Sequence, residues 1–371
     1  MDFYENQEQT RPTIIAMASG KGGVGKTVMS AAMGAGFAML KRKTVVVDAD
    51  FGGSNLHQVI GIPRPAYTYR DFQSGQVDTL NDIVIEHPRF DNLGMIFGAA
   101  GSYGMANEKY FNRQKFIRHL HHIDAEFVLL DLGAGSGFQV LDLFSVADMG
   151  LVMLNPEPLS LSEGFGFIKQ VVIRNLSHIL RQYPEVQSYV QEEAQKETFR
   201  SNTRVTELIE HITELHPEVA EKMRAQLDQL QIGLILNKVT EDDQVVEVEA
   251  LQKALRELLS MDTEFLGIVH LDPVVQNAVR EGVPFIASDS KALPSRDLAN
   301  LIIMKVLHRK HFHAFWDKRT LKKRTEEAPS QRKMVICSVN CMYWDECGYR
   351  KGGFPCGLQH MSEMGFQGEE E

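Results

Sequence analysis

The sequence predicts an α/β fold in which a parallel, doubly wound sheet is covered by helices on both faces. Short apolar runs rich in β-branched residues alternate with stretches that have helical apolar spacing. The runs are apolar throughout, which is typical of strands buried on both faces, and they do not alternate apolar with polar residues. Three of the runs have a carboxylate residue at or near their end. Buried strands joined through helices imply a parallel sheet.

Seven stretches are predicted to contain the strands. The first, "TIIAMAS", leads into a glycine loop and then into small and apolar residues at helical spacing, which predicts a strand, a loop and a helix. The second ends in "DAD", the fourth ends in an acid followed by glycines, and helical patterns separate the others. The stretches are Thr13–Ser19, Thr44–Asp50, Leu93–Ala99, Glu126–Gly135, Met149–Pro158, Ile232–Val239 and Glu264–Asp272.

A long polar stretch at about residues 183–230 interrupts this alternation. Apolar residues recur in it at helical spacing, and Pro184 and Pro217 stand near the expected helix boundaries. We therefore expect an insertion of two or more helices. The apolar residues at helical spacing are Val205, Leu208, Ile209, Ile212 and Leu215.

The predicted domain organisation has four parts. Residues 1–12 form a flexible N-terminus, and residues 13–310 form the α/β domain with its helical insertion. Residues 311–334 form a basic linker, and residues 335–371 form a small Cys-rich tail that is a candidate metal-binding module.

Composition limits the function classes. The 371 residues are 43% hydrophobic and 24% charged with a net charge of −10, so the chain as a whole does not attract nucleic acid or anionic lipid. No run approaches the roughly 18 to 20 uncharged apolar residues of a membrane span, and the first residues lack the apolar core of a secretory signal. We expect a cytoplasmic protein.

The glycine loop has the pattern G-x-x-x-x-G-K-[ST] from Gly20 to Thr27. Its glycines let backbone N–H groups turn toward a phosphate, and the helix that follows adds the partial positive charge of its N-terminus. Lys26 is expected to bridge phosphate oxygens, and the Thr27 hydroxyl to bind Mg²⁺. The loop predicts a P-loop NTPase that uses ATP and Mg²⁺.

Three carboxylates follow predicted strands where such a site needs them. Asp131 is expected to hold Mg²⁺, usually through water, and Asp50 to orient the attacking water. Asp48 lies nearer its strand, and we expect it to support the metal site from behind. Each is an ordinary turn or helix-capping residue when taken alone.

The expected nucleotide contacts extend beyond the loop. Gly133, in "LGAGSG", lets a backbone N–H approach the γ-phosphate. Asn237 ends a later strand where a base-recognising Asn is expected, and Thr240 stands where a guanine-reading pattern has Asp, which favours ATP over GTP. The full predicted set is Gly20, Lys21, Gly22, Gly23, Val24, Gly25, Lys26, Thr27, Val28, Gly133 and Asn237.

The loop "KGGVGKT", with Lys21 ahead of its glycines, resembles the deviant Walker A motif of the MinD/ParA ATPases. Further segments are similar to this family, with the MinD/FlhG (FleN) branch showing the nearest pattern. They are "VVVDADFGGSNLHQVIG", "FVLLDLGAGSGFQVLDLFSVAD", "LVMLNPEPLSL" and "GIVHLDPVVQNAVREGVPFI". The resemblance covers roughly residues 11–310 without the insertion, and it identifies residues 13–310 as an ATPase domain.

The resemblance implies a mechanism. ATP binding closes two subunits into a homodimer, and Lys21 reaches the partner's phosphates, so Lys21, Lys26 and Asp50 are the expected catalytic residues. A cation supplied across the interface makes hydrolysis depend on assembly. The resemblance further implies slow turnover stimulated by an activator or cargo protein that the sequence does not identify.

The C-terminal region carries two further signals. Residues 300–333 contain ten Lys or Arg and three acidic residues, which leaves three interpretations open: a solvated linker, a peripheral membrane contact assisted by Phe312, Phe315 and Trp316, or nonspecific DNA contact. Four cysteines so close together in a reducing compartment indicate Zn²⁺ or an iron–sulfur cluster, with free thiols as the third interpretation. They are Cys337, Cys341, Cys347 and Cys356.

The leading functional hypothesis is a MinD/FlhG-like ATPase that acts as a nucleotide-switched dimer in spatial positioning or in polar or flagellar assembly. The alternatives are an iron–sulfur or metal-cluster carrier ATPase and a partition ATPase of the ParA type for chromosomes or plasmids.

Overall fold

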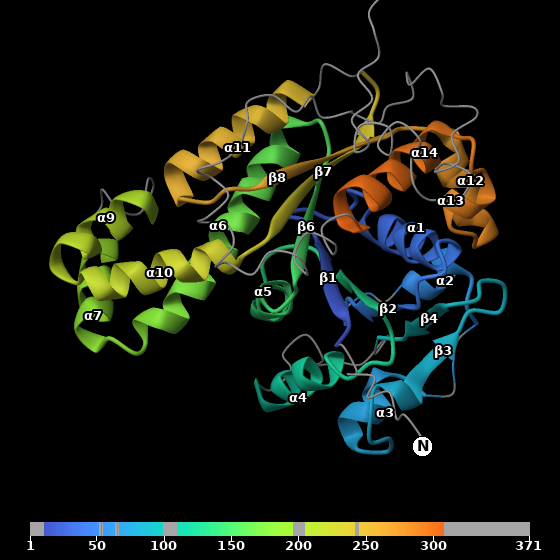
Figure 1. Ribbon diagram of the computed structural model, residues 1–371, viewed down its shortest axis with the longest axis horizontal. Helices are drawn as coiled ribbons and strands as arrows, with labels where there is room; N and C mark the ends of the chain where they lie inside the picture. The colour runs from blue at the N-terminus through green and yellow to red at the C-terminus, as the bar shows by residue number, and fades with distance from the viewer. Residues whose placement is uncertain are drawn as a thin grey trace, which may run out of the picture. The chain divides into compact units, whose positions relative to one another are not determined.

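The structure is a computed structural model (Figure 1). It describes residues 11–307 except for residues 52, 54, 64, 66, 99–109, 196–204 and 242–244. The chain divides into two compact units, residues 1–301 and residues 302–371. The sheet and helices described next belong to the first unit.

The described residues form one eight-stranded sheet. Its order is β3-β4-β2-β5-β1-β6-β7-β8, and every neighbouring pair is parallel except β3 with β4. The strands are β1 Thr13–Ala18, β2 Thr44–Ala49, β3 Val84–Glu86, β4 Leu93–Ile96, β5 Phe127–Leu132, β6 Met149–Leu154, β7 Ile232–Val239 and β8 Glu264–His270. The parallel, doubly wound sheet predicted from the sequence is confirmed.

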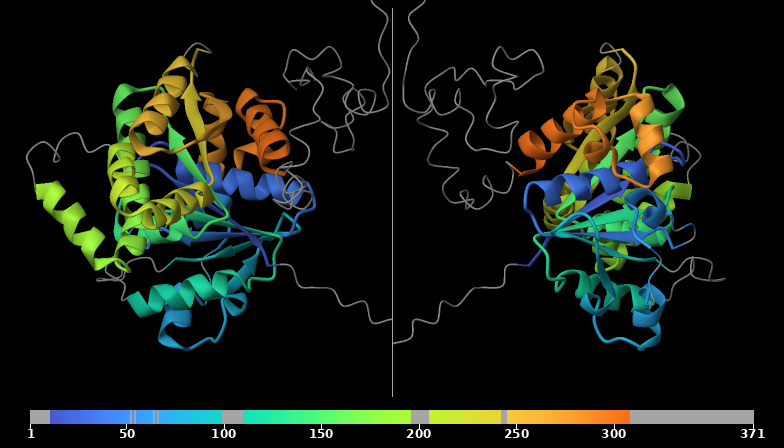
Figure 2. Two further views of the ribbon diagram at one scale, coloured as in Figure 1. Left: turned by 60° about the vertical axis from the view of Figure 1, so that its left-hand side comes forward. Right: turned by 90° about the vertical axis from the view of Figure 1, so that its right-hand side faces the viewer.

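Helices cover both faces of this sheet (Figures 1 and 2). The first face carries α1 Lys26–Met39, α2 Leu56–Ile60, α12 Pro273–Glu281, α13 Phe285–Ser288 and α14 Leu293–Asn300. The opposite face carries α3 Tyr69–Ser74, α4 Tyr110–Leu120, α5 Phe138–Ser145, α6 Pro158–Leu180 and α11 Val246–Leu259.

Each face of the central strands buries its own apolar layer, because successive side chains of a strand point to opposite faces. On the first face, Phe37 of α1 stacks on Phe127 of β5 with ring centroids 4.5 Å apart. On the second face, Phe144 of α5 and Phe167 of α6 meet edge to face at 5.1 Å. Each buried Phe contributes about 1.5–3 kcal/mol of transfer free energy. These layers fix α1 and α6 against the strands that end at the site.

The insertion is helical, as the apolar spacing predicts. It comprises α7 Pro184–Gln195, α9 Val205–Leu215 and α10 Pro217–Gln229, and these helices contact α6 and α11. Pro184 and Pro217 are the first residues of their helices, where a missing N–H costs no hydrogen bond. Ile209, Ile212 and Met223 are buried in the core cluster of the second face.

The observed strands differ from the predicted stretches in two ways. Most end before the polar residues that close those stretches, so Asp50, Gly133 and Asp272 lie in loops. Strand β3 was not predicted, because three residues are too short to show a period. It pairs antiparallel with β4 at the sheet edge.

Several predictions fall outside the described residues. They concern the N-terminal ten residues, the whole basic linker at residues 311–334 and the Cys-rich tail with Cys337, Cys341, Cys347 and Cys356. None of the helices in the described part of the chain combines the length and apolar character needed to span a lipid bilayer.

Candidate functional site

The candidate site lies where β1, β2 and β5 end side by side. Strand β1 is the neighbour of β5, and β5 is the neighbour of β2. Parallel strands place their carboxyl ends at one edge, which is where open α/β sheets bind ligands. The loop after β1 runs into α1, so the helix N-terminus faces the same edge.

Two glycines of the loop have backbone conformations that favour Gly. Gly23 has φ +82° and Gly25, the N-cap of α1, has φ +102°. Positive φ is strained for a residue with a Cβ atom. Gly20 has a different reason, because a Cβ on it would lie 2.1 Å from the carbonyl oxygen of Glu163 on α6. The loop therefore combines a turned backbone with close packing against α6.

Lys26 is buried at the base of the loop, with 8% of its surface exposed. Its ammonium donates to Ser19 Oγ at 3.0 Å, and Ser19 Oγ in turn donates to the Lys21 carbonyl at 2.6 Å. Burial lowers the pKa of Lys26, and the charges of Asp131 and Asp50 oppose that effect. The site thus holds a cation close to two carboxylates.

Asp131 is the carboxylate at the end of β5, and it is 1% exposed. Ser30 Oγ donates to its Oδ1 at 3.0 Å, and the Thr27 hydroxyl also donates to it. Burial raises the pKa of Asp131 to about 7, and the charge of Asp48 adds to the rise. Asp48 and Asp131 are in register on neighbouring strands.

Asp48 holds the loop that follows β2. Its Oδ1 accepts from the Asp50 N–H at 3.3 Å and its Oδ2 from the Leu56 N–H at 3.2 Å. Both oxygens therefore bond to backbone. This arrangement is compatible with the expected supporting position behind the metal site.

Asp50 lies over Gly133, so the loops after β2 and β5 meet. A Cβ on Gly133 would lie 3.3 Å from Asp50 Oδ1, and the Gly53 N–H donates to the same oxygen at 3.1 Å. The structure brings together Lys26, Thr27, Asp48, Asp50, Asp131 and Gly133, which the sequence predicts to act at one site. Their chemical roles remain predictions.

The donor set is suited to Mg²⁺ and phosphate. A hydroxyl and a carboxylate, Thr27 and Asp131, are already in contact, and both are the hard oxygen ligands that Mg²⁺ takes in proteins. The buried Lys26 and the helix N-terminus supply the positive charge that phosphate needs. The residues present therefore fit a magnesium–nucleotide complex.

Lys21 is half-buried in the loop. Its carbonyl accepts from Ser19, but its ammonium forms no hydrogen bond or ion pair with the part of the chain that the structure describes. The two lysines of the loop therefore differ: the ammonium of Lys26 bonds to Ser19, and that of Lys21 bonds to none of the described residues.

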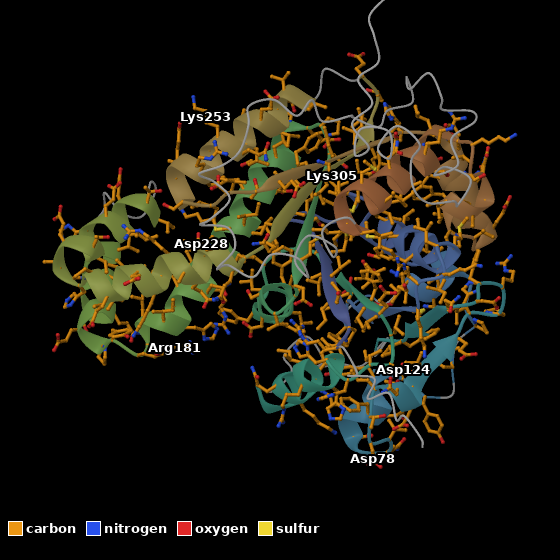
Figure 3. The ribbon with its side chains drawn as sticks, in the orientation of Figure 1. Asp78, Asp124, Arg181, Asp228, Lys253 and Lys305 are labelled. Carbon is orange, nitrogen blue, oxygen red and sulfur yellow. The ribbon has the colours of Figure 1, made fainter. Side chains whose placement is uncertain are left out.

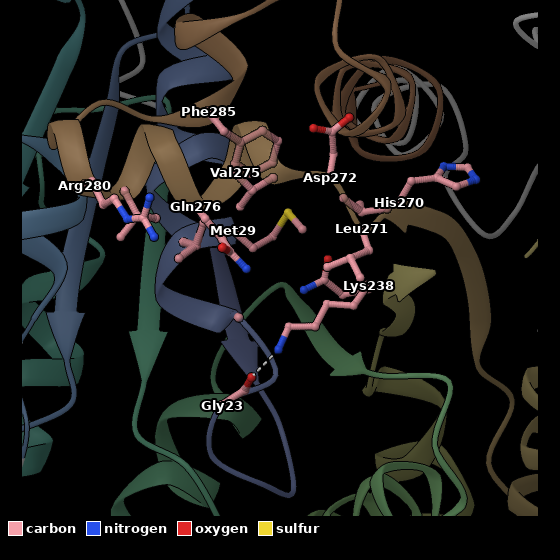
Figure 4. Close-up of a pocket in the computed structure, with 15 residues that line it drawn as sticks. Gly23, Met29, Lys238, His270, Leu271, Asp272, Val275, Gln276, Arg280 and Phe285 are labelled. Carbon is pink, nitrogen blue, oxygen red and sulfur yellow. Dashed lines mark hydrogen bonds between the residues drawn. The ribbon is translucent and has the colours of Figure 1, made fainter. Parts of the chain in front are cut away.

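A cavity of about 480 Å³ adjoins the loop on the side of β7 and β8 (Figure 4). Its apolar walls include Met29, Val275 and Phe285, which are suited to the flat face of a base. Val28, a predicted contact, also lines it. Asn237, which the sequence predicts to recognise the base, also lines it, but its amide Nδ2 donates to the Val24 carbonyl at 2.7 Å.

The sequence reasoning missed three polar residues of this site. Ser19 and Ser30 bond Lys26 and Asp131, and Lys238 Nζ donates to the Gly23 carbonyl at 2.8 Å. Ser19 and Ser30 lie just before and just after the phosphate loop in the sequence, so the sequence could have suggested them as contacts of the site. Lys238 follows the predicted contact Asn237, but adjacent side chains of a regular strand point to opposite faces, so the sequence does not predict that Lys238 reaches Gly23.

A family profile supports the nucleotide-binding interpretation. The CobQ/CobB/MinD/ParA nucleotide binding domain matches residues 15–285. Its span includes the phosphate loop, all three carboxylates and the walls of the cavity.

Curated relatives match a shorter part. An uncharacterized ATP-binding protein of Methanocaldococcus jannaschii is 34% identical over 154 residues, which cover 42% of this chain and 57% of that protein. The septum site-determining protein MinD of Escherichia coli is 35% identical over 151 residues, which cover 40% of this chain and 55% of MinD. The chain thus spans about half the length of the curated relatives it matches.

Solved structures share the fold. MinD from Pyrococcus horikoshii, complexed with Mg-ADP, superposes with a TM-score of 0.53 at 20% identity and covers 80% of this chain and 97% of that one. A MinC:MinD cell division protein complex from Aquifex aeolicus gives a TM-score of 0.50 at 20% identity, covering 86% of this chain and 98% of that one. At such identity the likeness shows the fold alone.

Proposed function

The chain belongs to the family of CobQ/CobB/MinD/ParA nucleotide-binding domains, and on this premise we propose that it is an ATPase that dimerises on binding ATP and hydrolyses it to ADP and phosphate. The observation that carries the proposal is the cluster at the ends of β1, β2 and β5. There the buried Lys26 of the glycine-rich loop lies close to the carboxylates of Asp50 and Asp131. The MinD/ParA family consists of ATPases, which agrees with this chemistry.

ATP binding is assigned to the loop from Gly20 to Val28. Its N–H groups and Lys26 hold the phosphates, and the apolar cavity beside β8 holds the base. Mg²⁺, when bound, neutralises phosphate charge, and Thr27 and Asp131 are the residues that would hold it. The Mg-ADP bound to the MinD structure from P. horikoshii supports this pairing of nucleotide and ion.

Hydrolysis is assigned to Asp50 with the two lysines. The Asp50 carboxylate, next to Gly133, would orient the attacking water on the side of the γ-phosphate. Lys26 would stabilise the negative charge that develops on the transferred phosphoryl group. A second copy of the chain would add Lys21, whose ammonium has no partner among the described residues.

The dimer gives the ATPase a switching function. The two subunits would close when ATP binds and separate after hydrolysis, so the dimer and the monomer would expose different surfaces. An activator or cargo protein would recognise one of these two states. The likeness to septum site-determining MinD proteins supports a role in spatial positioning, and polar or flagellar assembly is a process of the same kind. A fluorescent fusion whose distribution is the same for wild type and Asp50→Ala would contradict this switch.

Lys21 provides the decisive experiment. We expect Lys21→Ala to bind labelled ATP within about threefold of wild type, because Lys26 and the loop remain. The variant should stay monomeric in size-exclusion chromatography with light scattering in Mg-ATP, and its phosphate release should fall by about a hundredfold or more.

Two variants frame that test. Lys26→Ala should lose nucleotide binding itself, and Lys253→Ala should behave as wild type. Lys253 projects from α11 with 74% of its side chain exposed (Figure 3). If Lys21→Ala dimerises and hydrolyses ATP normally, the proposed sharing of the site between two copies is wrong.

A further inference from the structure

Two adjacent side chains of β7 hold two consecutive carbonyl oxygens of the phosphate loop. Asn237 Nδ2 donates to the Val24 carbonyl at 2.7 Å, and Lys238 Nζ donates to the Gly23 carbonyl at 2.8 Å. Figure 4 shows Lys238 extended toward Gly23, while Asp272 and His270 point away from it. The strand therefore contacts the loop at Gly23, one of the two loop glycines that have positive φ, and at Val24, which lies between them.

A β-bulge makes this double contact geometrically accessible. Adjacent side chains of a regular strand point to opposite faces, so Asn237 and Lys238 are not expected to reach the same loop. The pairing of β7 with β8 shifts register between Asn237 and Val239, and Lys238 has φ +60°. Bulges redirect a side chain, and strained residues of this kind concentrate at functional sites.

The two contacts determine where the loop N–H groups point. In a trans peptide the C=O of one residue and the N–H of the next point in opposite directions. Holding the carbonyls of Gly23 and Val24 toward β7 therefore turns the N–H groups of Val24 and Gly25 the other way. Gly23 and Gly25 permit this with φ of +82° and +102°. Successive N–H groups turned to one side form an anion-binding concavity.

Gly25 shows how closely β7 approaches the loop. A Cβ on Gly25 would lie 2.7 Å from Asn237 Nδ2, so a side chain there would displace the amide. Lys238 is exposed, and its ammonium donates to the Gly23 carbonyl, so it acts on the backbone of the loop.

We propose that Asn237 and Lys238 are positioning residues that hold the phosphate loop in its anion-binding conformation, so that β7 sets the affinity for the polyphosphate of any nucleotide. This inference rests on the proposed nucleotide-binding function. It assigns to the Asn-Lys pair a task other than recognition of the base. Loss of Lys238 then weakens every polyphosphate by the same factor.

The test compares three ligands on Lys238→Met. Affinities for ATP, GTP and inorganic tripolyphosphate are measured by displacement of a fluorescently labelled ADP from the full chain. Each should fall by about tenfold, the usual effect of one lost hydrogen bond to a charged group. Lys238→Arg should recover most of the affinity, and Lys253→Met should match wild type.

A fourth variant separates positioning from folding. Glycine tolerates φ +60°, so Lys238→Gly should unfold in urea at a concentration equal to or above that of Lys238→Met. It should nevertheless lose as much polyphosphate affinity, because it lacks the ammonium. If Lys238 only stabilised the fold, the affinity for polyphosphate would fall in the same order as the urea midpoint across the variants.

The outcomes identify which idea fails. If Lys238→Met weakens ATP and leaves tripolyphosphate unchanged, Lys238 serves the base and the inference is overturned. The same holds if affinity and urea midpoint fall in proportion. A wild-type chain that binds none of the three ligands refutes the proposed function, and with it the inference.

Discussion

Asp131→Asn tests the electrostatics of the site through folding stability alone. Burial and the neighbouring Asp48 raise the pKa of Asp131 from 3.8 to about 7. The folded chain therefore keeps this proton over a pH range in which the unfolded chain has lost it. The stability that the raised pKa contributes is fully present below pH 3.8 and is lost as pH rises through 7.

The magnitude follows from that interval. A pKa difference of about three corresponds to roughly 4 kcal/mol, at about 1.4 kcal/mol for each unit. Between pH 5.5 and pH 8 the loss is about 2 kcal/mol. Asn has nearly the same shape and does not titrate, so the unfolding free energy of Asp131→Asn minus that of wild type should rise by about this amount over the same range.

The assay is urea unfolding at a series of pH values without Mg²⁺ or nucleotide. The amide also changes the hydrogen bond with Ser30, but that effect on the unfolding free energy is the same at every pH. It therefore does not contribute to the change of the difference with pH. Asp124→Asn is the control for replacing a carboxylate by an amide at the surface, because Asp124 is 75% exposed and its partner Lys43 is also exposed (Figure 3). A flat difference between Asp131→Asn and wild type over this pH range would refute the raised pKa. In Mg-ADP at pH 8, wild type should gain more stability than the variant, since Asp131 is a proposed ligand of Mg²⁺.

Two further predictions concern neighbouring parts of the site. Asp50→Asn should bind ATP as wild type does and release phosphate at least about a hundredfold more slowly, since it loses the group that orients the water; normal turnover in a phosphate-release assay would show that another residue has this task. Gly20→Ala should lower the unfolding free energy in urea by about 1–3 kcal/mol, because its Cβ would lie 2.1 Å from the Glu163 carbonyl oxygen. Gly166→Ala, on the same helix with open space around it, should be neutral or slightly stabilising, and equal effects of the two alanines would contradict the close packing of Gly20.

The sequence by itself determined the phosphate loop, the helical insertion and the parallel sheet. These features are encoded in contiguous residues: Gly20 to Thr27 carry the chemistry of the loop, and unbroken apolar runs specify strands buried on both faces. Strand β3 was not predicted, because three residues are too few to show the periodicity of a strand. It forms the antiparallel edge of the sheet only by pairing with β4.

Only the tertiary structure decided how distant residues combine. Asp48 and Asp131 face each other because β2 and β5 are neighbours in register, and that closeness raises the pKa of Asp131. Lys238 reaches Gly23, 215 positions away, because a bulge in β7 turns it toward the loop. Strand order and the register shift beside Lys238 set these distances, and neither property is a local feature of the chain.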